Sequence, residues 1–337
     1  MSGFTVAIVG ATGVVGNRFI QVLEQRNFPV NVMRMMASKR SVGRTLAFRG
    51  EQIPVEETTD DSFRGVDIVF LSATTEASRH FGPIAAKAGA LVIDDSSAWR
   101  MDPEVPLVVP EVNGEDVKWH KGIISTPNCT TVPMVMLAKP LHDVNPILRI
   151  IADTYQAVSG TGGAAVRELE EQTRALLDGG SARPDVYPHQ IAFNVLPQVD
   201  SFLENGYTKE EWKMVQETRK IMHLPNLPIS ATCVRVPVPV SHSEALHLEF
   251  TDAMSADEAR RILSAAPGII VQDDPANSVY PMPVNAAGRD EVFVGRIRQD
   301  ASHPRGLALW VVSDNLMKGA ALNAVQIAET AVRYGVR

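Results

Sequence analysis

Apolar and polar positions over the first 130 residues follow a pattern that predicts strands and helices in turn. A compact apolar run at residues 4–9 is followed by a glycine-containing loop and then by a helical pattern that ends near Arg26. Strands alternating with helices of this length are typical of a parallel sheet covered on both faces. The remaining elements predicted in this part are strands at 30–37, 67–72, 91–93 and 107–109 and a helix at 75–89.

The pattern changes after residue 149, where long apolar strands occur with fewer helices between them. This predicts a mixed or antiparallel sheet with helices on one face, an α+β domain. The stretch 179–197 carries three prolines and is too long for a simple connection, so we expect a lid or an interface element. A final amphipathic helix is expected at 316–332. The strands predicted in this part are 149–158, 229–236, 243–250, 291–299 and 306–313.

Length and composition bound the class of protein. A chain of 337 residues with 45% hydrophobic residues can build two packed domains. Its net charge of −7 and the lack of a dense Lys/Arg run argue against a nucleic-acid surface. No signal-peptide pattern or apolar stretch of about 18 residues is present, so we expect no membrane association. Two cysteines give no disulfide framework, which fits a reducing cytoplasm.

A glycine loop between the first strand and the first helix predicts a dinucleotide site. A phosphate-binding turn in this position offers backbone N–H groups and the positive end of a helix to a pyrophosphate. The spacing is GxxGxxG rather than the commoner GxGxxG, and glycines also serve ordinary turns. The loop comprises Gly10, Ala11, Thr12, Gly13, Val14, Val15 and Gly16.

The end of the second strand favours NADP over NAD. An NAD site usually ends this strand with an acidic residue that holds the ribose 2′-hydroxyl. Here Ser38, Lys39, Arg40 and Ser41 follow instead, and their hydroxyls and cations suit a 2′-phosphate. A solvated basic turn is the alternative.

Cys129 lies where a short apolar run turns into a helical pattern at 132–141. Unpaired N–H groups at a helix start stabilise a thiolate and can lower a cysteine pKa from about 8.5 to between about 3.5 and 7.5. Such a thiolate is a candidate nucleophile. A lone cysteine is more often a small buried hydrophobe, and position alone does not decide between the two.

Six motifs together resemble bacterial aspartate-semialdehyde dehydrogenase over nearly the whole chain and in the order of that family. They are GATGVVG at 10–16, SSAWRMD at 96–102, STPNCTT at 125–131, QAVSGTG at 156–162, RVPVPVSHSE at 235–244 and DNLMKGAALNAVQIAE at 314–329. The resemblance implies an NADP-dependent phosphorylating aldehyde dehydrogenase. Such an enzyme reduces L-4-aspartyl phosphate to L-aspartate 4-semialdehyde and releases phosphate, on the route to lysine, methionine, threonine, isoleucine and diaminopimelate.

The resemblance also implies a set of catalytic residues. Cys129 would form an aspartyl thioester, and Asn128 would support the thiolate or the developing oxyanion. Gln156 would orient the acyl intermediate, and His242 would serve as the acid/base group near neutral pH.

Substrate and cofactor contacts carry over in the same way. Arg235, in an apolar strand, would grip the α-carboxylate. Glu210 would bind the ammonium, although the adjacent Glu211 is an alternative. Arg100 and Lys213 would bind phosphate, and Glu210 and Lys213 have the i, i+3 spacing of one helix face. Ser159, Gly160 and Asn315 would contact the cofactor, and no metal is expected.

The expected architecture is a Rossmann-like NADP domain, residues 1–128, which the C-terminal helix at 315–337 completes. A catalytic and dimerisation domain at 129–314 would form a homodimer, with a tetramer left open. Two alternatives are N-acetyl-glutamyl-phosphate reductase, whose usual Gly-Cys-Tyr-Pro motif is absent, and a non-catalytic NADP-binding redox sensor. Glyceraldehyde-3-phosphate dehydrogenase shares the Cys-Thr-Thr stretch but normally has a GxGxxG loop.

Overall fold

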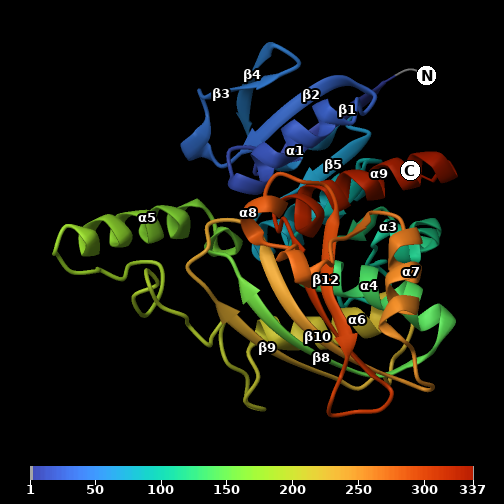
Figure 1. Cartoon of the computed structure of the whole chain (residues 1–337). Helices are drawn as coiled ribbons and strands as arrows, with labels where there is room; N and C mark the ends of the chain where they lie inside the picture. The colour runs from blue at the N-terminus through green and yellow to red at the C-terminus, as the bar shows by residue number, and fades with distance from the viewer. Residues whose placement is uncertain (1–2, 337) are drawn as a thin grey trace. The chain divides into compact units, whose positions relative to one another are not determined.

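The computed structural model describes residues 3–336, which divide into two compact units (Figure 1). Of the described residues, 3–127 and 320–336 form unit 1, and 128–319 form unit 2. The C-terminal helix α9 therefore belongs with the N-terminal unit, as the expected fold class requires. The sequence-derived domain boundaries stay a prediction.

Unit 1 is built around a seven-stranded sheet in the order β3-β4-β2-β1-β5-β6-β7. Every pairing in it is parallel except β3 with β4, which is antiparallel. The strands are β1 (Phe4–Val9), β2 (Val30–Ala37), β3 (Thr45–Phe48), β4 (Glu51–Glu57), β5 (Ile68–Leu71), β6 (Leu91–Asp94) and β7 (Ile123–Ser125). The α-helices are α1 (Val14–Gln25), α2 (Thr75–Lys87), α3 (Pro110–Asn113) and α9 (Leu322–Tyr334).

Two features of this sheet differ from the sequence-based expectation. The β3–β4 hairpin was not predicted. Its turn, Arg49-Gly50, has positive φ at both residues, which suits a tight hairpin turn. The strand expected at 107–109 is wrong, because only Leu107 bridges to Ser125 and Pro110 then opens α3. A proline at that point starts a helix and cannot continue a ladder.

Unit 2 is built around a six-stranded mixed sheet in the order β11-β12-β13-β10-β8-β9. Its strands are β8 (Ile147–Gln156), β9 (Ile229–Arg235), β10 (His242–Phe250), β11 (Ile269–Val271), β12 (Val292–Gln299) and β13 (Gly306–Ser313). Its α-helices are α4 (Thr131–Val144), α5 (Gly163–Leu177), α6 (Lys209–Ile221), α7 (Ala256–Ala265) and α8 (Pro283–Ala286). The predicted α+β class is confirmed, and no helix or strand lies within 179–197.

Burial along the central strands shows which face of this sheet is covered. On β10, the side chains of Glu244, Leu246 and Leu248 are buried, whereas those of Ala245, His247 and Glu249, which alternate with them, are partly exposed. The period of two places the buried set on one face. Helix α4 contacts β8, β10 and β13, so this face carries the helical layer.

Three short 3₁₀ helices complete unit 1 at Lys39–Ser41, Asp60–Phe63 and Gly114–Trp119, and η4 (Val158–Thr161) and Pro275–Asn277 belong to unit 2. The helix expected at 316–332 begins as a π-helical turn, Met317–Ala321, and becomes α-helical at Leu322. Among residues 3–336, no helix is both long and apolar enough to cross a membrane.

Candidate active site

The glycine loop of unit 1 leaves the start of α1 open to an anion. Gly13 is the N-cap of α1 and gives no side-chain cap, and the first turn holds no acidic residue. The N–H groups at the start of a helix lack intrahelical partners, so those of Val14, Val15 and Gly16 can bind a phosphate. Gly10 has φ +84°, and a Cβ there would lie 1.9 Å from the Ser72 carbonyl oxygen. The loop therefore requires glycine and fits a dinucleotide.

The residues expected to bind a 2′-phosphate lie at the end of β2, within unit 1. The Oγ1 of Thr12 is 3.2 Å from the Oγ of Ser41, which joins the glycine loop to this segment. Ser38 and Arg40 are exposed. The segment Lys39–Ser41 is a 3₁₀ turn with two cations and no carboxylate. Hydroxyls and cations are therefore available beside the glycine loop.

Arg100 is also in unit 1, where its side chain is buried and Nη2 donates to the backbone oxygen of Asp95 at 3.1 Å. Burial raises the pKa of Asp95 to about 6, although the Arg100 charge opposes this. Thr126 donates from Oγ1 to the Asp95 carboxylate at 2.8 Å. Arg100 is thus held by the segment between β6 and β7, whose chain continues to Cys129.

Cys129 precedes helix α4 by two residues, as the sequence predicts, and is partly exposed. Asn128 shapes this turn, because its Oδ1 accepts hydrogen bonds from Thr130 N at 2.9 Å and Thr130 Oγ1 at 2.6 Å. A Cβ on Gly319 would lie 2.9 Å from the Cβ of Cys129. Only glycine allows the π-helical turn to approach the cysteine this closely.

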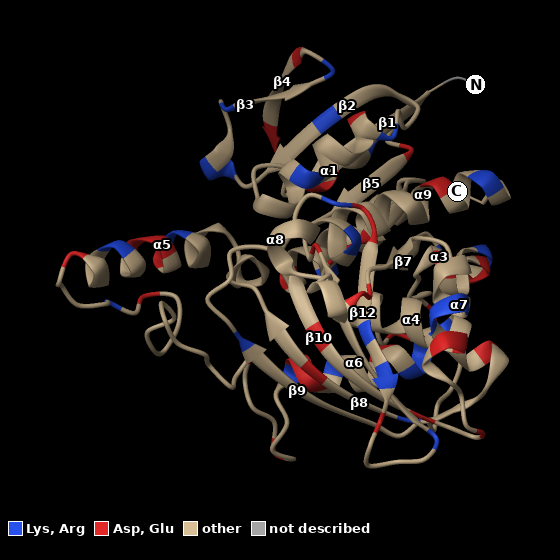
Figure 2. Cartoon of the chain, viewed as in Figure 1, with Lys and Arg blue, Asp and Glu red and all other residues tan. Residues whose placement is uncertain are grey.

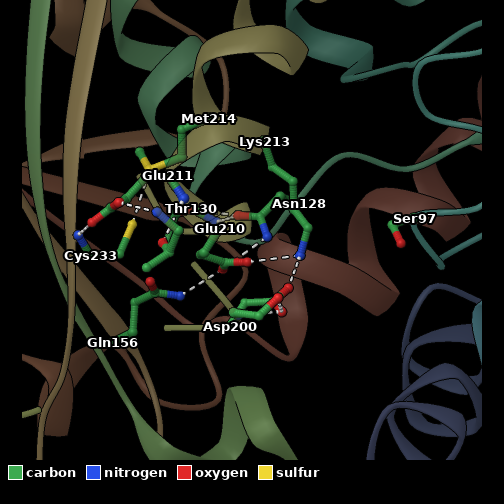
Figure 3. Close-up of polar contacts among 12 residues, drawn as sticks. Ser97, Asn128, Thr130, Gln156, Asp200, Glu210, Glu211, Lys213, Met214 and Cys233 are labelled. Atoms are coloured by element: carbon green, nitrogen blue, oxygen red, sulfur yellow. Dashed lines mark hydrogen bonds and ion pairs between the residues drawn. The ribbon is translucent and has the colours of Figure 1, made fainter. Parts of the chain in front are cut away.

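Glu210 is the centre of a buried polar network, drawn in Figure 3. Its Oε1 accepts hydrogen bonds from Asn128 Nδ2 at 3.0 Å and Gln156 Nε2 at 2.9 Å, and its Oε2 lies 3.1 Å from Lys213 Nζ. Burial alone would raise the pKa of Glu210, but the Lys213 charge and these donors outweigh it and lower the pKa to about 2. The network therefore holds a carboxylate in its charged form.

The two adjacent glutamates have different surroundings. Glu211 accepts the backbone N–H of Thr208 in a capping box and that of Cys233 at 2.9 Å. Each of its two carboxylate oxygens therefore accepts a hydrogen bond from a backbone N–H group. Lys213 bridges Glu210 and Asp200, and these anions raise its pKa above the usual value despite burial.

His242 on β10 and Arg235 on β9 lie on the two strands that flank β8, and both side chains are buried. His242 Nδ1 accepts the Ala157 N–H at 2.9 Å, so the neutral ring carries its proton on Nε2. Burial, and then the Arg235 charge, lower the pKa of His242 to about 3. Near neutral pH the ring is therefore uncharged. The neutral ring presents Nε2–H as a donor, and the acid/base role expected of His242 stays a prediction.

Gly160 lies against both of these side chains. A Cβ there would come within 3.1 Å of Arg235 Nη1 and 3.2 Å of His242 Nε2. Next to it, the hydroxyl of Ser159 and the amide of Asn315 are hydrogen-bonded at 3.0 Å, and Asn315 Oδ1 also accepts the Ser241 N–H. The three cofactor contacts expected in this unit are thus close together. Their roles stay predictions.

One residue of the network was missed from the sequence. Glu217, buried on α6, accepts the Asn128 N–H at 2.6 Å. It lies seven residues after Glu210, so the helical period would have placed both on one face. Cys233 is buried against Met214, as expected of a core residue, and burial raises its pKa. Among residues 3–336, no group of three or more His, Cys, Asp or Glu could hold a metal ion.

Comparison with known proteins identifies the family. The family model for the semialdehyde dehydrogenase NAD-binding domain matches residues 5–120, and that for the semialdehyde dehydrogenase dimerisation domain matches residues 138–318. The aspartate-semialdehyde dehydrogenase of Aquifex aeolicus is 54% identical over 338 residues, which cover 99% of each chain. The chain belongs to the aspartate-semialdehyde dehydrogenase family. It is therefore an enzyme and an oxidoreductase.

Solved structures of the family match the fold. Aspartate semialdehyde dehydrogenase II of Vibrio cholerae complexed with ASA has a TM-score of 0.96 and 46% identity, and 99% of each chain is covered. The enzyme of Candida albicans with NADP has a TM-score of 0.78 and 26% identity, with 98% and 99% of the chains covered. The resemblance drawn from the six motifs is confirmed.

Proposed function

We propose that this enzyme reduces L-4-aspartyl phosphate to L-aspartate 4-semialdehyde with NADPH and releases phosphate. The buried Glu210 network beside Cys129 is the observation that carries the proposal, because it offers a zwitterion a fixed negative charge next to a cysteine. One close relative was solved with ASA and another relative with NADP, which supports the same ligands here. The reaction belongs to lysine, methionine, threonine, isoleucine and diaminopimelate biosynthesis.

Cys129 is the proposed nucleophile. Its sulfur attacks the acyl carbon, a C–S bond forms, and the C–O bond to phosphate breaks, with the electron pair leaving on the phosphate. Cys129 lies two residues before α4, in the turn held by Asn128, and the positive end of a helix favours a thiolate. Gln156, hydrogen-bonded to Glu210 and Thr154, orients the acyl group.

Bound NADPH supplies the hydride that reduces the thioester. The former carbonyl oxygen then carries negative charge, and the Nε2–H of His242 donates to it. When the C–S bond breaks, its electron pair returns to Cys129 and the carbonyl of the aldehyde forms. The lowered pKa of His242 favours the neutral ring, in which Nε2–H is this donor.

Two charged residues hold the ends of the substrate. Arg235 takes the α-carboxylate, because its guanidinium is buried and Nη1 alone has a hydrogen bond to a described residue, to the Ala157 oxygen at 2.7 Å. Glu210 takes the ammonium in preference to Glu211, whose oxygens are both committed to backbone N–H groups. Arg100 and Lys213 are the proposed phosphate ligands.

NADP fits unit 1 better than NAD. The first-turn N–H groups of α1 suit the pyrophosphate, and the segment of Ser38, Arg40 and Ser41 suits a 2′-phosphate. We also infer a cytoplasmic homodimer from the two free cysteines and from the match of unit 2 to a dimerisation-domain model.

Phosphate-dependent reduction of NADP with L-aspartate semialdehyde tests the proposal directly. Turnover that requires both phosphate and this aldehyde is expected. Turnover with N-acetyl-glutamate semialdehyde alone would assign the alternative reductase, and NADP binding without any turnover would indicate a sensor.

A further inference from the structure

The proline-containing stretch at residues 179–197, here called the proline segment, is fixed in place by helix α5. The buried carboxylate of Glu168 accepts the N–H groups of Asp185 and Val186, and Gln172 Oε1 accepts those of Ile191 and Ala192 at 3.0 and 3.2 Å. Charged residues of both signs lie along α5 (Figure 2). The two buried polar side chains of α5 thus hold the backbone of the segment.

Leu196, near the end of the segment, pairs with Arg235 at the edge of the sheet. Strand β9 is an edge strand, and its residue Arg235 exchanges both backbone hydrogen bonds with Leu196, at 2.8 and 2.9 Å. An edge position lacks neighbours on one side, and this bridge supplies them for one residue. The backbone of Arg235 is therefore held by Leu196 on one side and by its β8 partner, Gln156, on the other.

Tyr187 ties the segment to the side chain of the same arginine. The centre of its ring lies 6.0 Å from the guanidinium carbon of Arg235. Its hydroxyl donates to Thr161 Oγ1 at 2.9 Å, in the 3₁₀ turn η4 that follows Gln156. The ring is thus anchored at its far end while its face is turned to the cation.

The guanidinium itself has few other constraints. Nη1 donates to the Ala157 oxygen, whereas Nε is buried and has no hydrogen-bond partner among the described residues. A long side chain that is held by a single hydrogen bond still samples several rotamers. It loses this conformational entropy when it binds a carboxylate, and the loss weakens binding. A neighbouring group that holds the guanidinium in its binding orientation before the substrate arrives reduces this loss.

We propose that the proline segment, through Tyr187 and Leu196, pre-orients Arg235 and so makes the enzyme selective for aldehydes that carry an α-carboxylate. Tyr187 is a positioning residue in this scheme and does not touch the reacting atoms. The inference rests on the proposed function, in which Arg235 binds that carboxylate.

The test compares two aldehydes in the full-length enzyme. L-Aspartate semialdehyde carries the carboxylate, and 3-aminopropanal has the same aldehyde and ammonium without it. For Tyr187→Leu we expect the KM for L-aspartate semialdehyde to rise about tenfold, equivalent to ~1.4 kcal/mol, with kcat within about twofold. The kcat/KM for 3-aminopropanal should stay within about twofold of wild type. Tyr187→Phe keeps the ring and loses the hydroxyl's bonds to Thr161 and to the Val158 oxygen, so it should give a smaller rise.

Tyr207→Leu is the matched control. Tyr207 also donates or accepts through its hydroxyl, with Ser230 at 3.0 Å, and its ring contacts Trp212, whereas the cation–π contact with Arg235 is made by Tyr187. It should leave both aldehydes unaffected. Equal losses of kcat/KM on both aldehydes in Tyr187→Leu, or an unchanged KM for L-aspartate semialdehyde, would overturn the inference. Wild-type turnover in the same assay would still support the proposed function. Absence of wild-type turnover would contradict both.

Discussion

Adjacent residues of this chain have different functions because their hydrogen-bond partners differ. Glu210 and Glu211 are both buried on α6, yet Glu211 caps the helix and binds the Cys233 N–H, whereas Glu210 contacts Asn128 and Gln156. The two cysteines differ in the same way. Cys129 is partly exposed before a helix, and Cys233 is buried on a strand. Chemistry at the residue scale follows from these surroundings.

Replacing Cys129 by alanine should abolish turnover, because no other group near the start of α4 can form the thioester. The affinity for NADP should stay within about twofold, since the proposed pyrophosphate site lies in the glycine loop. Steady-state assays and NADP titration measure the two effects. Brief alkylation of the wild type with iodoacetamide should modify Cys129 and spare Cys233, whose pKa burial raises. Turnover by Cys129→Ala would remove the thioester from the mechanism.

His242 should make the fold sensitive to acid. Its pKa of about 3 in the folded chain is below its unfolded value of about 6.5, so between these values the unfolded state binds the extra proton. Stability is then unaffected above about pH 6.5 and falls as the pH drops toward 3, by up to ~1.4 kcal/mol per pH unit. Denaturant unfolding of wild type and His242→Asn from pH 8 to 4 should show a shallower decline in the variant. Parallel curves would contradict the lowered pKa.

At the scale of elements, local patterns predicted most strands and helices. The apolar runs predicted β1, β2 and β13 with their observed bounds, because side-chain alternation and flanking turns are local properties. The hairpin at Arg49-Gly50 was missed, since β3 has four residues and β4, of seven residues, is mostly polar and contains a proline. The contacts of Tyr187 and Leu196 with Arg235 were also missed. They join residues 39 to 48 positions apart in a segment without periodicity, and only the folded chain brings them together.

The 3₁₀ turn after β2 should set the choice between cofactors. Ser38→Asp places a carboxylate where NAD enzymes usually have one, so it should repel a 2′-phosphate and accept a ribose hydroxyl. Arg40→Ala removes a cation from the same turn. Loss of a charged hydrogen bond amounts to ~1.5–3 kcal/mol, so we expect the KM for NADP to rise by about 10- to 100-fold in each variant. The KM for NAD should stay level or fall.

Arg64→Ala is the control for charge alone. Arg64 is an exposed cation of the same unit and is paired only with Asp61 in the neighbouring 3₁₀ helix. Its removal should leave both cofactors unaffected. A similar loss of NADP affinity in this control would mean that net charge, and not the turn after β2, discriminates the 2′-phosphate.

At the scale of the whole molecule, the sheet of unit 2 has one face without the α4 layer. Partly exposed side chains lie on that face of its central strands, including Tyr155 on β8 and His247 on β10. Tyr155 packs against Trp310 with ring centroids 5.3 Å apart, and 40% of its surface is exposed. Helix α8 covers the β12–β13 part of this face, where Ala286 packs with Phe293 and Val312. A partly exposed aromatic pair beside it is the kind of surface that is enriched at subunit contacts. The match of residues 138–318 to a dimerisation-domain model supports the same assignment.

We expect light scattering after size-exclusion chromatography to give the mass of two 36.7-kDa chains for the wild type. Tyr155→Glu should shift the mass toward one chain at micromolar concentration, because a buried unpaired carboxylate opposes association. Tyr334→Glu is the matched control. Tyr334 is equally exposed, at 41%, but lies in unit 1, outside the matched dimerisation domain. A dimer that resists Tyr155→Glu but not Tyr334→Glu would move the interface to unit 1, and a wild-type mass of four chains would require a second interface.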